Sequence, residues 1–114
     1  MRREEKLIKG EEFKNVFEGG EIHYGGELLR AFVLKRGGRG VRVGIVTGRK
    51  IGGAVRRNRA KRLLREGFRK IREELIDGQE IVLVPKRMAA EAKLSEIEDA
   101  LKEALIRAKS FKHE

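Results

Sequence analysis

Residues 53–76 read GAVRRNRAKRLLREGFRKIREELI and carry an amphipathic pattern. When successive residues are placed about 100° apart on a helical wheel, the apolar side chains fall in one arc about 140° wide. These side chains are Ala60, Leu63, Leu64, Phe68, Ile71 and Leu75. The pattern predicts a helix from about Gly53 to Ile76, ended by Asp77-Gly78, with one face packed on a core.

A cationic stripe lies beside this apolar arc, between about 100° and 200° on the same wheel. It contains Asn58 together with Lys61, Arg62, Arg65, Arg69 and Arg72. Like charges at this spacing repel and weaken a helix. An ordinary solvated face would balance them, but residues 56–65 contain no acidic residue. Glu66 can pair with Arg62 or Lys70, and Glu73 with Arg69, which leaves several cations without a partner.

Because the planar arginine fork grips phosphate oxygens bidentately, the stripe indicates a phosphate-bearing partner. The preceding loop, residues 48–53 (GRKIGG), adds Arg49 and Lys50 just before the helix. Backbone amides at a helix N-terminus attract anions, so the loop and first turn could hold a phosphate. The loop is not a Walker motif, since no Gly-Lys-Ser/Thr follows its glycines.

Three stretches outside the long helix have the composition of β-strands. Residues 27–35 and 41–47 are short apolar runs, and the glycine-rich residues 36–40 between them suit a hairpin tip. We therefore expect two antiparallel neighbours here, with residues 21–26 as either a third strand or an approach loop. Residues 80–85 are nearly all apolar, which is typical of a strand covered on both faces and ended by Pro85.

Two further helices are expected near the ends of the chain. Residues 9–20 place Phe13, Val16 and Phe17 on one face before a Gly19-Gly20 stop. Residues 95–98 (SEIE) form a capping box that opens a helix to about Lys109. Its apolar face consists of Ile97, Leu101, Ala104, Leu105 and Ala108. The predicted order is helix, two or three strands, long basic helix, strand and helix, an α/β fold.

Length and composition narrow the possible functions. The 114 residues suit a single domain, residues 1–114, and the formal net charge of +10 draws polyanions. The chain has no cysteine and only two histidines, His23 and His113, so it offers no thiolate site or histidine cluster. No segment reaches the roughly 18–20 apolar residues of a membrane span, and residues 1–10 lack a signal-peptide core, so we expect a cytoplasmic protein. Few Asn and Gln beside many charged residues favour a thermophilic source.

Candidate binding residues are easier to find than catalytic ones. Phe13 and Phe17 fit either a core position or a base-stacking surface. No Ser-His-Asp set, HExxH motif or acidic magnesium cluster is visible in the sequence. If the protein takes part in catalysis, we expect another molecule to supply the reactive groups.

Several stretches together resemble the bacterial ribonuclease P protein family. They are residues 42–46 (RVGIV), 49–62 (RKIGGAVRRNRAKR) and 64–68 (LREGF), with Arg-Asn-Arg followed by Lys-Arg as the family's defining motif. Residues 12–17 (EFKNVF) with Gly20 resemble its first helix, and residues 81–86 (IVLVPK) its final strand. The chain has Gly48 where the family usually has serine, and Leu28-Leu29 where an aromatic residue is common.

The resemblance implies an α+β sandwich in which two parallel strands flank the long helix through a left-handed crossover. It also implies a subunit that binds ribonuclease P RNA and helps it cleave precursor tRNA at the 5′ end of the mature sequence. Catalysis and most magnesium binding would belong to the RNA, with no catalytic or metal-binding residue in the protein. The residues expected to contact RNA are Arg49, Lys50, Arg57, Asn58, Arg59, Lys61, Arg62 and Arg65, to which the wheel adds Arg69.

The same resemblance implies a central cleft for the single-stranded 5′ leader of precursor tRNA. Phe13 and Phe17 are its expected aromatic residues, with Arg30 and Phe32 as candidates on the first strand. Two other functions remain open from the residues alone. One is a structural RNA-binding protein of ribosomal or chaperone type, and the other is a nuclease acting by itself, which the lack of a catalytic set disfavours.

Overall fold

The computed structural model describes residues 6–7 and 10–112, which form strands, helices and short 3₁₀ turns. The strands are β1 (Lys6–Leu7), β2 (Glu21–Gly25), β3 (Leu29–Lys35), β4 (Val41–Ile45) and β5 (Gln79–Pro85). The helices are α1 (Glu12–Gly19), α2 (Ala54–Ile71) and α3 (Leu94–Arg107), with short 3₁₀ turns η1 (Arg49–Ile51), η2 (Arg72–Glu74) and η3 (Arg87–Glu91). Apart from β1, which the sequence did not predict, this is the predicted order, with residues 21–25 as a true strand. His113 lies outside the described residues.

The strands form one mixed sheet in the order β1-β4-β5-β3-β2. The central strand, β5, pairs in parallel with β4 and antiparallel with β3. Its residues are buried apart from Val84, as expected of a strand covered on both faces. The long helix α2 connects β4 to β5, so the parallel pair and its helical crossover match the predicted architecture.

The predicted hairpin of residues 27–35 and 41–47 is wrong, because β5 lies between β3 and β4. The glycine-rich loop of residues 36–40 wraps around Gly78 instead of forming the tip of a hairpin. The amides of Arg36 and Gly37 donate to the Gly78 carbonyl at 2.8 and 3.0 Å, and the Gly78 amide donates to Gly40 at 2.7 Å. Gly78 has φ of 89°, and a Cβ there would lie 2.6 Å from Gly37. The loop thus admits β5 between the two strands.

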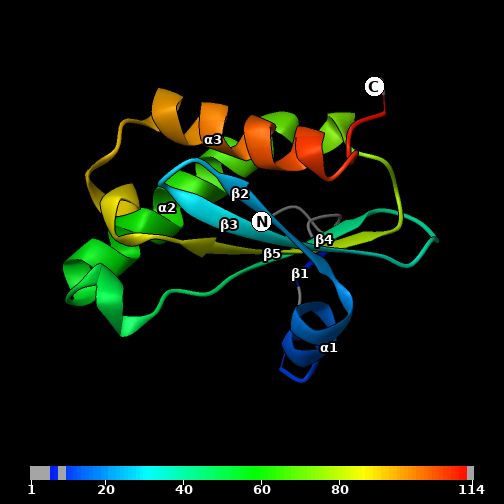
Figure 1. Ribbon diagram of the computed structural model, residues 1–114, viewed down its shortest axis with the longest axis horizontal. Coiled ribbons are helices and arrows are strands. Elements are labelled where there is room, and N and C mark those ends of the chain that lie inside the picture. The colour runs from blue at the N-terminus through cyan, green and yellow to red at the C-terminus, as the bar shows by residue number, and fades with distance from the viewer. Residues whose placement is uncertain (1–5, 8–9, 113–114) are drawn as a thin grey trace.

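The two faces of the sheet are covered unequally (Figure 1). Helices α2 and α3 lie together on one face and enclose the main core, which contains Ala31, Ile81 and Leu83 from the strands. Helix α1 lies on the other face, where Val16 packs with Phe32 and Val82 in a smaller cluster. The result is an α+β sandwich whose α1 face is only partly covered.

The ends of the two long helices differ from the expected positions. Helix α2 ends at Ile71 and continues as η2, although Leu75 is still buried. Helix α3 begins at Leu94, so Ser95 is not its N-cap. The Glu96 carboxylate, not that of Glu98, accepts the amide of the capping residue 93 at 2.8 Å. All five predicted apolar positions of α3 are buried.

Candidate RNA interface

The first turn of α2 is fixed by Arg56, whose side chain folds back over the preceding loop. Its Nε donates to the Ile51 carbonyl at 2.7 Å, and one terminal nitrogen pairs with Glu91 at 2.9 Å. Gly52 makes room for this arrangement: its φ is 125°, and a Cβ there would lie 2.7 Å from Arg56 Cδ. Arg56 therefore stabilises the loop–helix junction and has fewer N–H groups left for a ligand.

Two predicted RNA contacts, Arg57 and Arg59, also hold neighbouring backbone. Arg57 donates to the Gly52 carbonyl at 2.7 Å, and Arg59 donates through Nε to the Ala90 carbonyl at 2.6 Å. Each guanidinium keeps further N–H donors, since an arginine has five. These bonds orient both side chains in advance, and the Arg59 bond joins the start of α2 to the segment after β5.

The other predicted contacts have no hydrogen-bond or ion-pair partner in the part of the chain that the structure describes. They are Arg49, Lys50, Asn58, Lys61, Arg62, Arg65 and Arg69, all exposed except the half-buried Lys61. The side-chain pairs that Glu66 and Glu73 could have made with the stripe are likewise not observed among residues 10–112, and Lys70 pairs instead with Glu98 of α3 at 2.8 Å. The repulsion along α2 is therefore not relieved by local acids.

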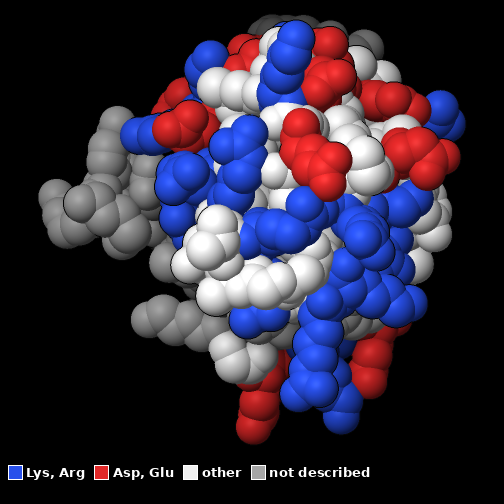
Figure 2. Space-filling view, turned by 90° about the vertical axis from the view of Figure 1, so that its left-hand side faces the viewer, with Lys and Arg blue, Asp and Glu red and all other residues white. Residues whose placement is uncertain are grey.

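Arg72 is the one member of the predicted stripe that turns toward the protein. Its guanidinium lies 5.7 Å from the centre of the Phe68 ring and donates to the Val41 carbonyl. The exposed stripe thus ends at Arg69. Figure 2 faces the end of the molecule that carries the start of α2 and shows Lys and Arg side chains gathered over a broad continuous area.

A second candidate surface lies between α1 and the sheet. Phe17 makes an edge-on contact with Phe32, with ring centres 4.7 Å apart, and Phe13 lies 6.5 Å from Phe17 with nearly parallel rings. Phe32 is buried, yet Phe17 keeps 38% of its surface exposed. The two interpretations of Phe17 are therefore compatible, because one side of its ring packs and the other remains open to a ligand. Arg30 lies 5.9 Å above the Phe32 ring.

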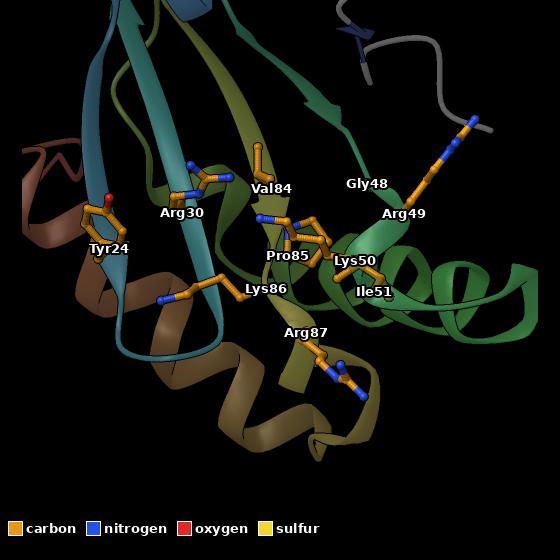
Figure 3. Close-up of a pocket in the computed structure, with 10 residues that line it drawn as sticks. All are labelled: Tyr24, Arg30, Gly48, Arg49, Lys50, Ile51, Val84, Pro85, Lys86 and Arg87. Carbon is orange, nitrogen blue, oxygen red and sulfur yellow. The ribbon is translucent and has the colours of Figure 1, made fainter.

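These two surfaces meet at a cleft of about 900 Å³ that the sequence did not reveal (Figure 3). The strands contribute Tyr24, Arg30, Val84 and Pro85, and the far wall is residues 48–51. Lys86 and Arg87 complete it, with the Lys86 ammonium 5.5 Å from the Tyr24 ring centre. The cleft therefore connects the predicted leader-binding side with the loop before α2.

Sequence reasoning missed Tyr24, Lys86 and Arg87. The alternation of residues 21–25 was a signal, since it places Ile22 and Tyr24 on one face of a strand. The paired cations directly after Pro85 were another. Neither pattern shows which strands are neighbours, and that requires the sheet order.

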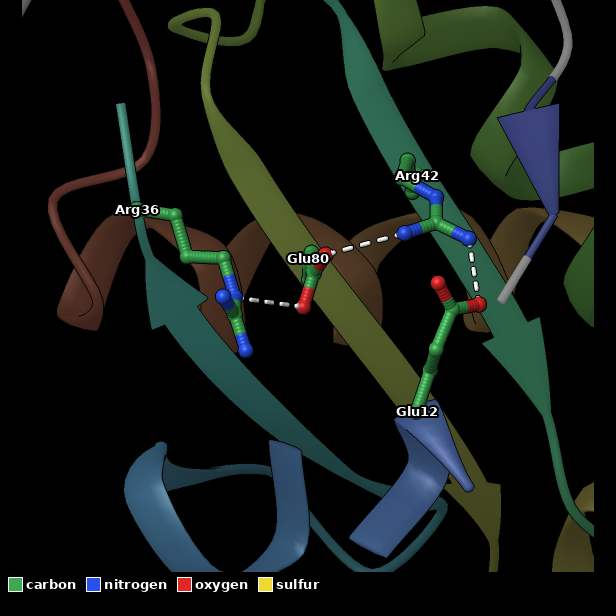
Figure 4. Close-up of polar contacts among 4 residues, drawn as sticks. All are labelled: Glu12, Arg36, Arg42 and Glu80. Atoms are coloured by element: carbon green, nitrogen blue, oxygen red, sulfur yellow. Dashed lines mark hydrogen bonds and ion pairs between the residues drawn. The ribbon is translucent and has the colours of Figure 1, made fainter. Parts of the chain in front are cut away.

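A buried carboxylate fastens α1 to the same face of the sheet (Figure 4). Glu80 of β5, only 8% exposed, accepts from Arg36 and from Arg42, each at 3.1 Å. Arg42 also pairs with Glu12 in the first turn of α1. The hydrogen bond with Glu12, supported by the charges of Glu12 and Glu80, raises the pKa of the Arg42 guanidinium above its usual value. Arg42 is therefore a permanent positive charge between two carboxylates.

The described residues offer neither a metal-ion cluster nor a membrane-spanning helix. Across residues 10–112, no three His, Asp or Glu side chains come together in a group that could hold a metal ion. None of the helices described here has the length and apolar character needed to cross a membrane.

Comparison with known proteins identifies the family to which these surfaces belong. The family model described as Ribonuclease P matches residues 1–109. The chain belongs to the ribonuclease P protein family. The ribonuclease P protein component of Bacillus cereus strain B4264 is 28% identical over 101 residues, which cover 89% of this chain and 88% of that protein. That of Bacillus anthracis strain CDC 684 is also 28% identical, covering 89% and 85%.

Solved ribonuclease P proteins share the fold. The Thermotoga maritima protein in complex with 1-(4-fluorophenyl)-2-thiourea is 31% identical, with a TM-score of 0.73 over 83% of this chain and 92% of that one. The Staphylococcus aureus protein gives a TM-score of 0.80 over 93% and 97% of the two chains. Because the Staphylococcus aureus protein is only 24% identical to this chain, its similarity is evidence for the fold alone.

Proposed function

We propose that this chain is the protein subunit of a ribonuclease P ribonucleoprotein and promotes the endonucleolytic 5′ maturation of tRNA. The observation that carries the proposal is the exposed row Arg62, Arg65 and Arg69 on a helix of a ribonuclease P family member, with no acidic partner in the described chain. Such a row is matched in spacing and chemistry to the phosphates of a folded RNA. Asn58, Lys61 and the loop cations Arg49 and Lys50 extend it.

The pre-oriented residues Arg57 and Arg59 would bind the same RNA at a smaller entropic cost than free side chains. Their guanidiniums are already held by backbone carbonyls, so little rotamer freedom is lost on binding. The free cations of the stripe would supply most of the salt-dependent affinity, because each phosphate contact releases condensed counterions.

The α1 face would bind the single-stranded 5′ leader of precursor tRNA. Phe17 offers an open aromatic edge beside Phe32, and successive bases can stack on such rings. Arg30 and Phe13 border the same surface. Contacts to the leader would raise the affinity for precursor over mature tRNA, since the mature product lacks the leader.

The chain's contribution to catalysis would be positioning and charge compensation. Magnesium ions held mainly by the RNA would activate water and stabilise the leaving oxygen. The protein's cations would lower the phosphate repulsion as the two RNAs approach each other. In this proposal the subunit would work within an endoribonuclease complex in the cytoplasm, with two RNA partners and no membrane.

Reconstitution tests the proposal directly. The purified chain, a bacterial ribonuclease P RNA, magnesium and end-labelled precursor tRNA are combined, and each component is omitted in turn. We expect the protein to stimulate cleavage at one site, the 5′ end of the mature tRNA, only with the RNA present. Binding without stimulation would favour the structural RNA-binding alternative, and cleavage by the protein alone would favour an independent nuclease.

A further inference from the structure

The loop that joins β3 to β4 carries a second group of exposed arginines, far from the start of α2. Residues 36–40 read RGGRG. Figure 1 shows this loop at the right-hand end of the long axis of the molecule, which measures 37 Å, and residues 48–53 with the start of α2 at the left-hand end. The cations that we assign to ribonuclease P RNA therefore lie apart from this loop.

Arg39 is exposed, and no contact within the protein explains it. In the described chain its guanidinium makes no hydrogen bond or ion pair. Asp77 directly precedes Gly78, around which the loop wraps, yet it forms no ion pair with Arg39 among residues 10–112. All five N–H donors of this arginine are therefore available to a ligand.

Arg36 is held at one nitrogen and open at the others. Its Nε donates to Glu80 at 3.1 Å, and 50% of the side chain stays exposed (Figure 4). Its two terminal nitrogens make no hydrogen bond in the part of the chain that the structure describes. Because Glu80 already fixes the guanidinium, a ligand that binds these nitrogens removes little further rotamer freedom.

The backbone between the two arginines is bare and carries free amides. A Cβ at Gly37 or Gly38 would meet no atom within 4 Å, so a ligand can approach this backbone closely. The amides of residues 36 and 37 donate to the Gly78 carbonyl, but those of residues 38–40 have no acceptor among the described residues. Successive free amides beside cationic side chains are suited to an anion.

RNA fits this combination of groups better than an acidic peptide does. A carboxylate offers oxygen acceptors alone. A nucleotide brings phosphate oxygens for the amides and guanidiniums, and also a flat base on which an arginine can stack. Arg-Gly-Gly segments occur in proteins that bind single-stranded nucleic acid. An unpaired RNA segment suits an exposed loop, because its bases are accessible without opening a duplex.

We propose that residues 36–40 form a second RNA-binding site, which takes an unpaired RNA segment through Arg36, Arg39 and the amides of residues 38–40. The site goes beyond the proposed function, since it requires neither ribonuclease P RNA nor a leader. Because it lies at the other end of the long axis from the start of α2, one protein can hold two RNA segments at once.

The amide signals of the loop report on this site directly. The isotope-labelled full chain is titrated with a short single-stranded RNA of repeating UUA sequence, and the NMR signals of residues 37–40 are followed. We expect these signals to shift and to saturate. The variant with Arg62, Arg65 and Arg69 replaced by glutamine should keep the affinity at the loop within about twofold, because the two sites are distant. Loop signals that stay fixed, or that move only when the row on α2 is intact, overturn the proposal.

Arg39→Gln removes one charge and the guanidinium plane at an exposed position. The affinity measured on the Gly37 and Gly38 signals should fall about threefold or more. Its slope against log salt concentration should decrease by about 0.7, the contribution of one phosphate contact with single-stranded RNA. Lys102→Gln, at an exposed site on α3, is the matched control and should keep the wild-type affinity and slope. Equal losses in the two variants would mean that net charge alone attracts the RNA, and would refute the site.

A polyaspartate peptide of the same charge tests the competing class of partner. We expect it to bind at the loop about fivefold or more weakly than the RNA, because it has no base to stack. Equal or tighter binding of the peptide would make an acidic protein the better partner and would overturn the proposal. These titrations contain no ribonuclease P RNA, so their outcome is independent of the reconstituted cleavage that tests the proposed function.

Discussion

Neutralising the exposed row on α2 should change how RNA binding responds to salt. The variant replaces Arg62, Arg65 and Arg69 by glutamine, which keeps good helix propensity and removes three charges. Within the described chain these side chains have no partner to lose, so the fold should be unaffected. Each phosphate contact contributes about 0.7–0.9 to the slope of log affinity against log salt concentration. Three contacts therefore predict a slope smaller by about 2–3.

The assay is filter binding or anisotropy with ribonuclease P RNA over a salt series. Between about 0.1 and 0.3 M salt, the wild-type protein should lose about 10- to 20-fold more affinity than the variant, because the concentration ratio of three is raised to the lost slope. A control variant replaces Lys102, Arg107 and Lys112, three cations on α3 and just after it, by glutamine. It removes the same charge and should keep the wild-type slope.

Two results would refute this reasoning. Equal slopes for the row variant and the wild type would place the RNA elsewhere on the surface. Equal reductions in the row and control variants would mean that net charge, and not the geometry of α2, determines the affinity.

Other substitutions test the remaining contacts. Phe17→Ala should weaken binding of precursor tRNA to the holoenzyme by about tenfold, since a base stack contributes about 1–3 kcal/mol. The affinity for mature tRNA should stay nearly unchanged. Equal losses of affinity for both RNAs would indicate a packing role alone. Glu80→Gln should lower the free energy of unfolding by about 1–3 kcal/mol in urea, because its two arginine partners lose a buried countercharge, whereas Glu27→Gln, at an exposed site, should change it by less than about 0.5 kcal/mol. Gly25→Ala should destabilise the protein by about 1–3 kcal/mol or more, since its Cβ would lie 2.4 Å from a backbone oxygen of α3. Gly48→Ala is the control, because the space around Gly48 is open. Equal stability of the two variants would contradict the close approach of Gly25 to α3.

Most of the helices and strands follow from local sequence patterns, whereas the order of the strands in the sheet does not. The apolar arcs of α2 and α3 and the continuous apolar run of β5 predicted elements that the structure confirms, because burial imposes a regular period on a helix or strand. The pairing of β3 with β4 was predicted wrongly, because β5 lies between them. A five-residue glycine-rich loop fits a hairpin, and nothing local shows that Gly78, some forty residues away along the chain, fills it.

The candidate site likewise has a part that the sequence predicts and a part that depends on tertiary contacts. The exposed row on α2 could be predicted, since a helical wheel fixes which side chains share a face. The tethering of Arg59 to Ala90 and the turning of Arg72 onto Phe68 could not, because both depend on tertiary neighbours. Tyr24 and Lys86 meet only through the sheet order, so the sequence patterns around each of them did not predict the cleft that they border.

The unequal covering of the two sheet faces has an evolutionary consequence. The residues that hold the fold together, such as Ile81 and Leu83 of β5, point toward α2 and α3, while Val84 of the same strand and its neighbour Arg30 on β3 point the other way. Alternation along a strand thus separates the two sets by a single backbone layer. Substitutions on the open face can adjust which RNA is recognised while the main core stays intact, so selectivity and foldability are able to drift independently within this small chain.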